Sequence, residues 1–106
     1  MSALEKLAEE GFLLRSLPQY PRHLRVEKYD CAALVELTPE GSLRQFSSAG
    51  FLIDGQIALL VERDGRQVFA YKVKQVEAEG ERLEAFRSFE RELKEVLEQQ
   101  GIGNSE

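Results

Sequence analysis

The chain has 106 residues, the length of one small domain, with 42% hydrophobic residues, 31% charged residues and a formal net charge of −5. This composition supports a folded core and argues against a wholly disordered chain. A single cysteine, Cys31, excludes an intrachain disulfide and a cysteine-cluster metal or iron–sulfur site, and favours a reducing, cytoplasmic setting.

The first predicted element is a short helix near the N-terminus. Ser2 and Glu5 have the spacing of a capping box, in which each side chain satisfies a backbone amide of the other. Gly11 is a suitable stop for this helix. Pro18 and Pro21 follow, and no helix runs through two prolines so spaced. The segment around them is therefore expected to be a turn or an extended connector.

Beyond the prolines the hydrophobic period changes to two, which predicts β-strands. Six strands are expected, over residues 23–29, 31–37, 43–47, 51–53, 57–61 and 68–73. Asp54-Gly55 and Asp64-Gly65 each separate two apolar runs, a pattern typical of two-residue hairpin turns. Loops of that length predict the cross-strand pairs Phe51–Ala58, Leu52–Ile57, Leu59–Ala70, Leu60–Phe69 and Val61–Val68.

This register makes both faces of the two hairpins apolar, so the strand over residues 57–61 should be covered on both sides. One face carries the first candidate interface, which consists of Leu52, Ile57, Leu59, Val61 and Val68. The opposite face carries Phe51, Ala58, Leu60, Phe69, Tyr71 and Val73. The pattern leaves open which of the two faces the helices cover.

The last predicted element is a long amphipathic helix over about residues 80–100, packed on the sheet. Its apolar positions recur at helical spacing, at Leu83, Phe86, Phe89, Leu93, Val96 and Leu97. Gly101 is the predicted C-cap, and residues 102–106 are expected to form a flexible tail.

The predicted fold class is α+β, with a single domain over residues 1–101. It comprises a short N-terminal helix, an antiparallel meander of about six strands, either an open sheet or a partial barrel, and the long C-terminal helix. In outline this order is similar to that of small barrel adaptor domains of the pleckstrin-homology kind, from which the N-terminal helix departs. No motif accompanies that similarity, which concerns the fold alone.

Few residues suggest catalysis. His23 and Cys31 are the single imidazole and the single thiol, and a nucleophilic pair would need them in contact. An enzyme hypothesis would rest on these two residues with Tyr29 and Asp30. The alternative is that His23 lies at the rim and Cys31 is a small buried side chain. No ligand spacing indicates a metal, so no catalytic residue, metal or cofactor is expected.

Charge is divided unevenly along the chain. Residues 77–106 have a net charge of −5 and residues 1–10 of −2, whereas residues 11–76 have a net charge of +2. The strand region therefore contains a candidate anion patch, composed of Arg22, Arg25, Lys28, Lys72 and Lys74. The alternative is that these cations complement the acidic helices within the fold.

Several partners are not expected. An acidic chain does not attract nucleic acid through its overall field. No apolar run approaches the roughly 18 residues of a membrane span, and the first residues lack the pattern of a secretory signal.

These observations predict a non-catalytic interaction module in the cytoplasm. It would form a homodimer, or bind an unknown protein partner, through an apolar sheet face, because an isologous dimer would bury the second face. The alternative is a domain that binds a small ligand or an anion in a pocket between the sheet and the C-terminal helix.

Overall fold

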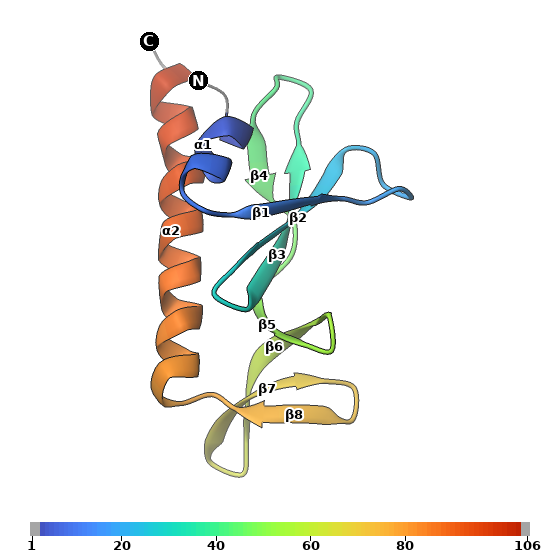
Figure 1. Ribbon diagram of the computed structural model, residues 1–106, viewed down its shortest axis with the longest axis vertical. Helices are drawn as coiled ribbons and strands as arrows, with labels where there is room; N and C mark the ends of the chain where they lie inside the picture. The colour runs from blue at the N-terminus through green and yellow to red at the C-terminus, as the bar shows by residue number, and fades with distance from the viewer. Residues whose placement is uncertain (1–2, 105–106) are drawn as a thin grey trace.

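The computed structural model describes residues 3–104 and confirms the α+β class. A short helix, α1 (Ala3–Glu9), comes first and a 25-residue helix, α2 (Gly80–Asn104), comes last. Between them lie β1 (Leu13–Ser16), β2 (His23–Lys28), β3 (Cys31–Leu37), β4 (Leu43–Gln45), β5 (Gly50–Ile53), β6 (Gln56–Arg63), β7 (Arg66–Tyr71) and β8 (Lys74–Glu77). The long helix runs beside the sheet for the length of the molecule, and α1 packs against it (Figure 1).

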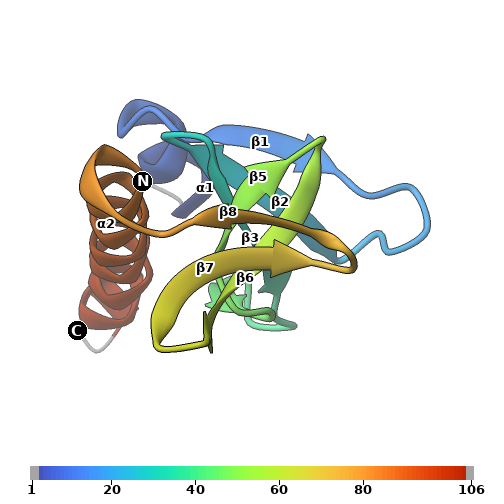
Figure 2. The same ribbon diagram turned by 90° about the horizontal axis from the view of Figure 1, so that it is seen from below.

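The strands form one antiparallel sheet that curls into a half-barrel (Figure 2). Its order is β1-β2-β3-β5-β6-β7-β8, and β4 pairs with the end of β3 that β5 leaves free. No pairing joins β1 to β8 in the described part of the chain, so these two strands are the two ends of the strand order. The half-barrel is therefore open.

The register predicted for the two Asp-Gly hairpins is confirmed. The observed pairs include Phe51–Ala58, Leu52–Ile57, Leu59–Ala70, Leu60–Phe69 and Val61–Val68. In Asp54-Gly55 and Asp64-Gly65, φ lies between 50° and 78° at both turn positions. A two-residue turn that matches the strand twist requires positive φ at both positions, which aspartate and glycine tolerate better than most residues.

Other details differ from the sequence prediction. The structure adds two strands, β1 and β8, at the edges of the sheet. Val73, expected within the strand over residues 68–73, lies in the turn between β7 and β8 and is 96% exposed, because Lys72 adopts a φ of 55° and reverses the chain. The helix α2 continues past Gly101 to Asn104, since a helix tolerates an internal glycine at a cost of about 1 kcal/mol. Of the expected tail, residues 105–106 lie outside the described residues.

The core lies between α2 and one face of the sheet. Its centre is a row of three aromatic rings, with centroids 5.3 Å apart from Phe51 to Phe69 and 5.1 Å apart from Phe69 to Phe86. Farther along α2, the fully buried Phe89 lies 5.7 Å from the ring of Phe12. The helices therefore cover the face that carries Phe51 and Phe69, which the sequence pattern left open.

A close backbone approach fixes the start of β5. A Cβ atom on Gly50 would lie 2.4 Å from the carbonyl oxygen of Ala58 on β6. Real Cβ atoms do not come so close to a backbone oxygen, so a side chain at this position would force β5 away from β6.

Candidate functional site

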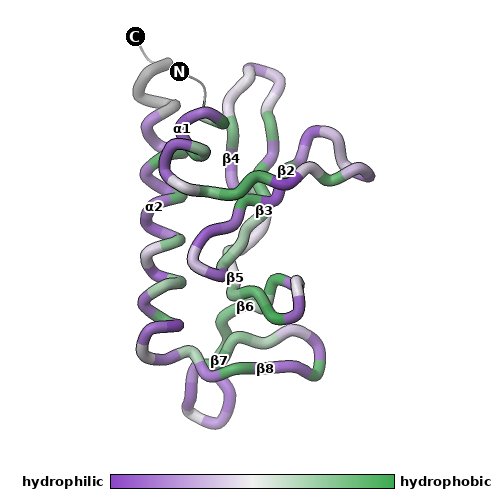
Figure 3. The backbone as a smooth tube through the Cα atoms, in the orientation of Figure 1, coloured by the Kyte–Doolittle hydropathy of each residue, from purple (hydrophilic) through white to green (hydrophobic). Residues whose placement is uncertain are grey.

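The five predicted interface residues share the sheet face that α2 does not cover, because their positions alternate with those of Phe51, Leu60 and Phe69. We call them the apolar patch: Leu52, Ile57, Leu59, Val61 and Val68. Cross-strand pairing makes the patch continuous across β5, β6 and β7, and the central part of β6 is coloured largely hydrophobic in Figure 3.

Exposure varies within the apolar patch. Leu59 is 44% exposed, whereas Val68 is 4% exposed and the other three members are half-buried. Leu59 lies between Ile57 and Val61 on β6 and is the most exposed member of the patch.

Two members of the predicted anion patch, Arg22 and Lys28, bind partners away from the β5–β6 turn. Lys28 is on the α2 side of the sheet, where its Nζ lies 2.5 Å from a carboxylate oxygen of Glu92. Arg22 precedes β2 and donates from Nε to the carbonyl oxygen of Leu37, at 3.2 Å. Both cations thus have partners within the chain.

The other three members gather near the β5–β6 turn. Arg25 donates from Nη1 to the carbonyl oxygen of Gly55, at 2.8 Å. Lys74 pairs with Asp54 in the same turn, and the Nζ of Lys72 lies 5.3 Å from the centre of the Tyr71 ring. The structure therefore brings Arg25, Lys72 and Lys74 to one end of the sheet.

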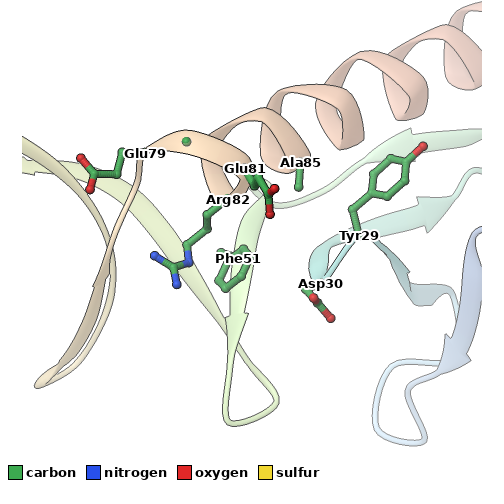
Figure 4. Close-up of a pocket in the computed structure, with 8 residues that line it drawn as sticks. Tyr29, Asp30, Phe51, Glu79, Glu81, Arg82 and Ala85 are labelled. Carbon is green, nitrogen blue, oxygen red and sulfur yellow. The ribbon is translucent and has the colours of Figure 1, made fainter.

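A pocket of about 680 Å³ lies between the sheet and the first turn of α2, where the ligand-binding hypothesis places one. Tyr29 and Asp30 line it from the β2–β3 turn, and Phe51 lines it from β5 (Figure 4). Arg82 of α2 lies over the Phe51 ring, 5.5 Å from its centre, and donates to the carbonyl oxygen of Glu77 at 2.7 Å. The protein's own guanidinium therefore occupies the aromatic face of this pocket.

The remaining charges of this pocket are negative. Its lining includes the carboxylates of Asp30, Glu79 and Glu81. Three carboxylates beside one arginine repel an anion, so the pocket at the start of α2 is electrostatically suited to a cationic group.

His23 and Cys31 lie at opposite ends of the β2–β3 ladder. His23 pairs with Glu36, whereas Cys31 pairs with Lys28, five positions away, which is about 17 Å at the usual strand rise. The His23 ring lies 4.4 Å from that of Phe46, and its Nε2 is 3.8 Å from a carboxylate oxygen of Glu36. The contact that a nucleophilic Cys–His pair requires is not formed.

We predict that Cys31 reacts slowly with iodoacetamide in the folded protein. The side chain is fully buried, and burial, aided by the negative charges of Asp30 and Glu90, raises the pKa of the thiol to about 12. Mass spectrometry at pH 8 should show little alkylation of the native chain and rapid alkylation of the same chain in denaturant. Fast native labelling that follows an ordinary thiol pKa would contradict this prediction.

Sequence reasoning missed a cluster that joins the β2–β3 hairpin to α2. We call Lys28, Tyr29 and Glu92 the hairpin clasp. Lys28 bonds one carboxylate oxygen of Glu92, and the Tyr29 hydroxyl donates to the other at 2.8 Å. Lys28 also donates to the carbonyl oxygen of Glu10 and lies 5.2 Å from the Phe12 ring centre. No sequence signal relates residues so far apart, because their contact depends on how α2 crosses the sheet.

The charges of the hairpin clasp shift each other's pKa. The hydrogen bond to Glu92 raises the pKa of Lys28, against the opposing effect of burial. Burial acts to raise the pKa of Glu92, but the hydrogen bonds from Lys28 and Tyr29 outweigh it, so this pKa lies below its ordinary value. Each partner therefore favours the charged form of the other.

Within residues 3–104, no group of three or more histidine, cysteine, aspartate or glutamate side chains is placed to hold a metal ion. None of the helices described has both the length and the apolar character needed to cross a membrane. Comparison of the chain with protein-family models, with curated proteins and with solved structures finds no match.

Proposed function

We propose that this chain is a non-catalytic interaction module that pairs with a second copy of itself through the apolar patch. The observation that carries the proposal is the exposure of Leu59, which is 44% accessible on an apolar sheet face that neither α1 nor α2 covers. A leucine at this position is costly to leave in water. The single cysteine supports the cytoplasm as the setting.

A two-fold arrangement suits the shape of this surface. In an isologous dimer each copy contributes the same residues, so Leu59 near the axis would face Leu59 of the second copy. Burying the exposed part of this side chain contributes about 1 kcal/mol per copy, scaled from the value for a whole leucine. The half-buried Ile57 and Val61 beside it add further apolar area.

The test is the mass of the protein in solution. We expect light scattering at micromolar concentration to give twice the chain mass for the wild type, and the single chain mass for Leu59→Lys with an unchanged circular dichroism spectrum. Because Leu59 points away from the core, the lysine should be tolerated by the fold.

Val73→Lys is the matched control, since it adds the same charge at an exposed valine outside the apolar patch. This variant should remain dimeric. A wild-type chain that stays monomeric at the highest soluble concentration, or a Leu59→Lys chain that stays dimeric, would rule out association through the patch.

The second candidate function is ligand binding in the pocket at the start of α2, between Phe51 and Glu81. The observation that favours it is the pocket itself, at the predicted junction of sheet and helix. Its carboxylates favour a cationic ligand, in contrast to the anion considered from sequence. In a thermal-shift screen of organic cations, a cation that binds the folded state should raise the melting temperature of the protein.

A further inference from the structure

A separate pocket lies on the side of the sheet away from the Figure 4 pocket. It has a volume of about 360 Å³ and is lined by the β1–β2 loop, by β2 and β3, by the start of β6 and by the end of β7. Figures 1 and 2 both place the β1–β2 loop on the side of the molecule opposite α2. The lining of this separate pocket includes Leu17, Tyr20, Arg25, Leu34, Ile57 and Tyr71, and we call this space the Arg25 pocket.

The guanidinium of Arg25 is held in place by one hydrogen bond within β2 and one to the β5–β6 turn. Its Nε donates to Glu27 at 2.7 Å, and its Nη1 donates to the carbonyl oxygen of Gly55 at 2.8 Å. Glu27 is itself buried and accepts a second bond, from Arg15 at 2.8 Å. These contacts use two of the five N–H groups of Arg25, and the other three have no partner among residues 3–104.

The net charge of Arg15, Glu27 and Arg25 determines which charge a ligand of this pocket should carry. Arg15, Glu27 and Arg25 together carry one positive charge, and the side chain of Arg25 is only 22% exposed. A partly desolvated guanidinium with free donors binds a carboxylate strongly, because charge-assisted hydrogen bonds gain strength as water is excluded. One net charge suits a monoanion better than a phosphate dianion.

The walls of the Arg25 pocket are largely apolar. Leu17, Leu34 and Ile57 contribute aliphatic surface, and Tyr20 and Tyr71 contribute rings. The volume falls near the lower end of the range of about 300–1,000 Å³ for ligand pockets. Such a pocket combines apolar walls with one oriented charged group, which is the usual design of a small-molecule site.

We propose that the Arg25 pocket binds a small apolar molecule that carries one carboxylate. The carboxylate accepts hydrogen bonds from the free donors of Arg25, and the apolar body lies against Leu34 and Ile57. This inference does not rest on the proposed dimer, but the two sites share one side chain, because Ile57 belongs both to the apolar patch and to the lining of the Arg25 pocket.

Isothermal titration of the full chain with 3-phenylpropionate tests the site. We expect saturable binding of one molecule per chain, at least tenfold weaker binding of the neutral 3-phenyl-1-propanol, and at least tenfold weaker binding of inorganic phosphate. Arg25→Gln should weaken 3-phenylpropionate binding about tenfold or more, since a hydrogen bond to a charged group contributes about 1.5–3 kcal/mol.

Arg44→Gln is the matched control, because it removes the same charge and also breaks an arginine–glutamate pair, at 2.6 Å from Glu36, outside the pocket. It should bind normally. Leu34→Phe keeps the arginine but fills the space, so it should lose binding even if Arg25→Gln fails to fold. Absence of binding to the wild type, or equal binding by Arg25→Gln or Leu34→Phe, would overturn the proposal.

The same titration separates this proposal from self-association. Leu59 is outside the lining of the Arg25 pocket, so Leu59→Lys should bind 3-phenylpropionate within about twofold of the wild type. If the chain is monomeric and binds 3-phenylpropionate normally, the pocket proposal is upheld and the dimer proposal is rejected. If the chain is dimeric and does not bind 3-phenylpropionate, the dimer proposal is upheld and the pocket proposal is rejected.

Discussion

Replacing Phe69 by alanine is expected to lower the free energy of unfolding by about 3–5 kcal/mol, the usual cost of truncating a buried aromatic ring. Phe69 is fully buried, and its ring lies between those of Phe51 and Phe86, which joins β5 and β7 to α2. This decrease is a large fraction of the free energy of unfolding of a typical domain, which is roughly 5–15 kcal/mol. Urea denaturation followed by circular dichroism measures it.

Phe46→Ala is the control for this substitution. It removes the same ring from a side chain that is 58% exposed, so it should cost less than about 1 kcal/mol. A loss of that small size for Phe69→Ala would mean that α2 does not pack on the face of the sheet that carries Phe69.

The hairpins could be predicted from sequence because their turn residues act locally. Aspartate followed by glycine accepts positive φ at both positions, and this alone determined the pairing of Val61 with Val68. The face that α2 covers could not be predicted in this way, because both faces of β6 are apolar. Which face α2 covers depends on side-chain packing, because the aromatic rings of Phe51 and Phe69 fill the space beneath α2.

The edge strands show where periodicity fails. β8 has one apolar residue, Val76, and β1 is mostly exposed, so neither gives the alternation of a half-buried strand. Backbone pairing with β7 and β2 defines them instead. Short, charged edge strands are also what protects an open sheet from uncontrolled pairing with other chains.

The distribution of the basic residues could be predicted only in part. The predicted anion patch includes both Arg25 and Lys28 because they are three positions apart in the sequence. Side chains alternate along β2, however, so the two residues lie on opposite faces of the sheet. Arg25 meets Gly55 and Lys28 meets Glu92, across 30 and 64 positions of the chain. Contacts at that separation depend on the curl of the sheet and the path of α2, for which local patterns give no rule.

Glu92→Gln is expected to lower the free energy of unfolding at pH 7 by about 1–2 kcal/mol, the value for a hydrogen-bonded charge, reduced for partial exposure. The glutamine keeps the size of the side chain but removes the charge that Lys28 and Tyr29 contact at 2.5 and 2.8 Å. Lys28 would then remain on the α2 side of the sheet without its carboxylate. Glu95→Gln, on the same helix with its carboxylate 3.9 Å from Arg91, is the exposed control and should change stability little.

The pH dependence of this difference follows from the two pKa shifts. The pKa of Glu92 is lowered by folding, so its contribution is complete above the unfolded value, about 4.5, and is lost as pH falls through the lower folded value. The pKa of Lys28 is raised, so its contribution is complete below the unfolded value of 10.5 and is lost as pH rises through the higher folded value. Wild type and Glu92→Gln should therefore differ by a constant amount between about pH 5 and pH 10 and converge at both extremes. Urea denaturation at a series of pH values measures this, and a difference that persists unchanged at pH 2 would show that the hairpin clasp does not act through these charges.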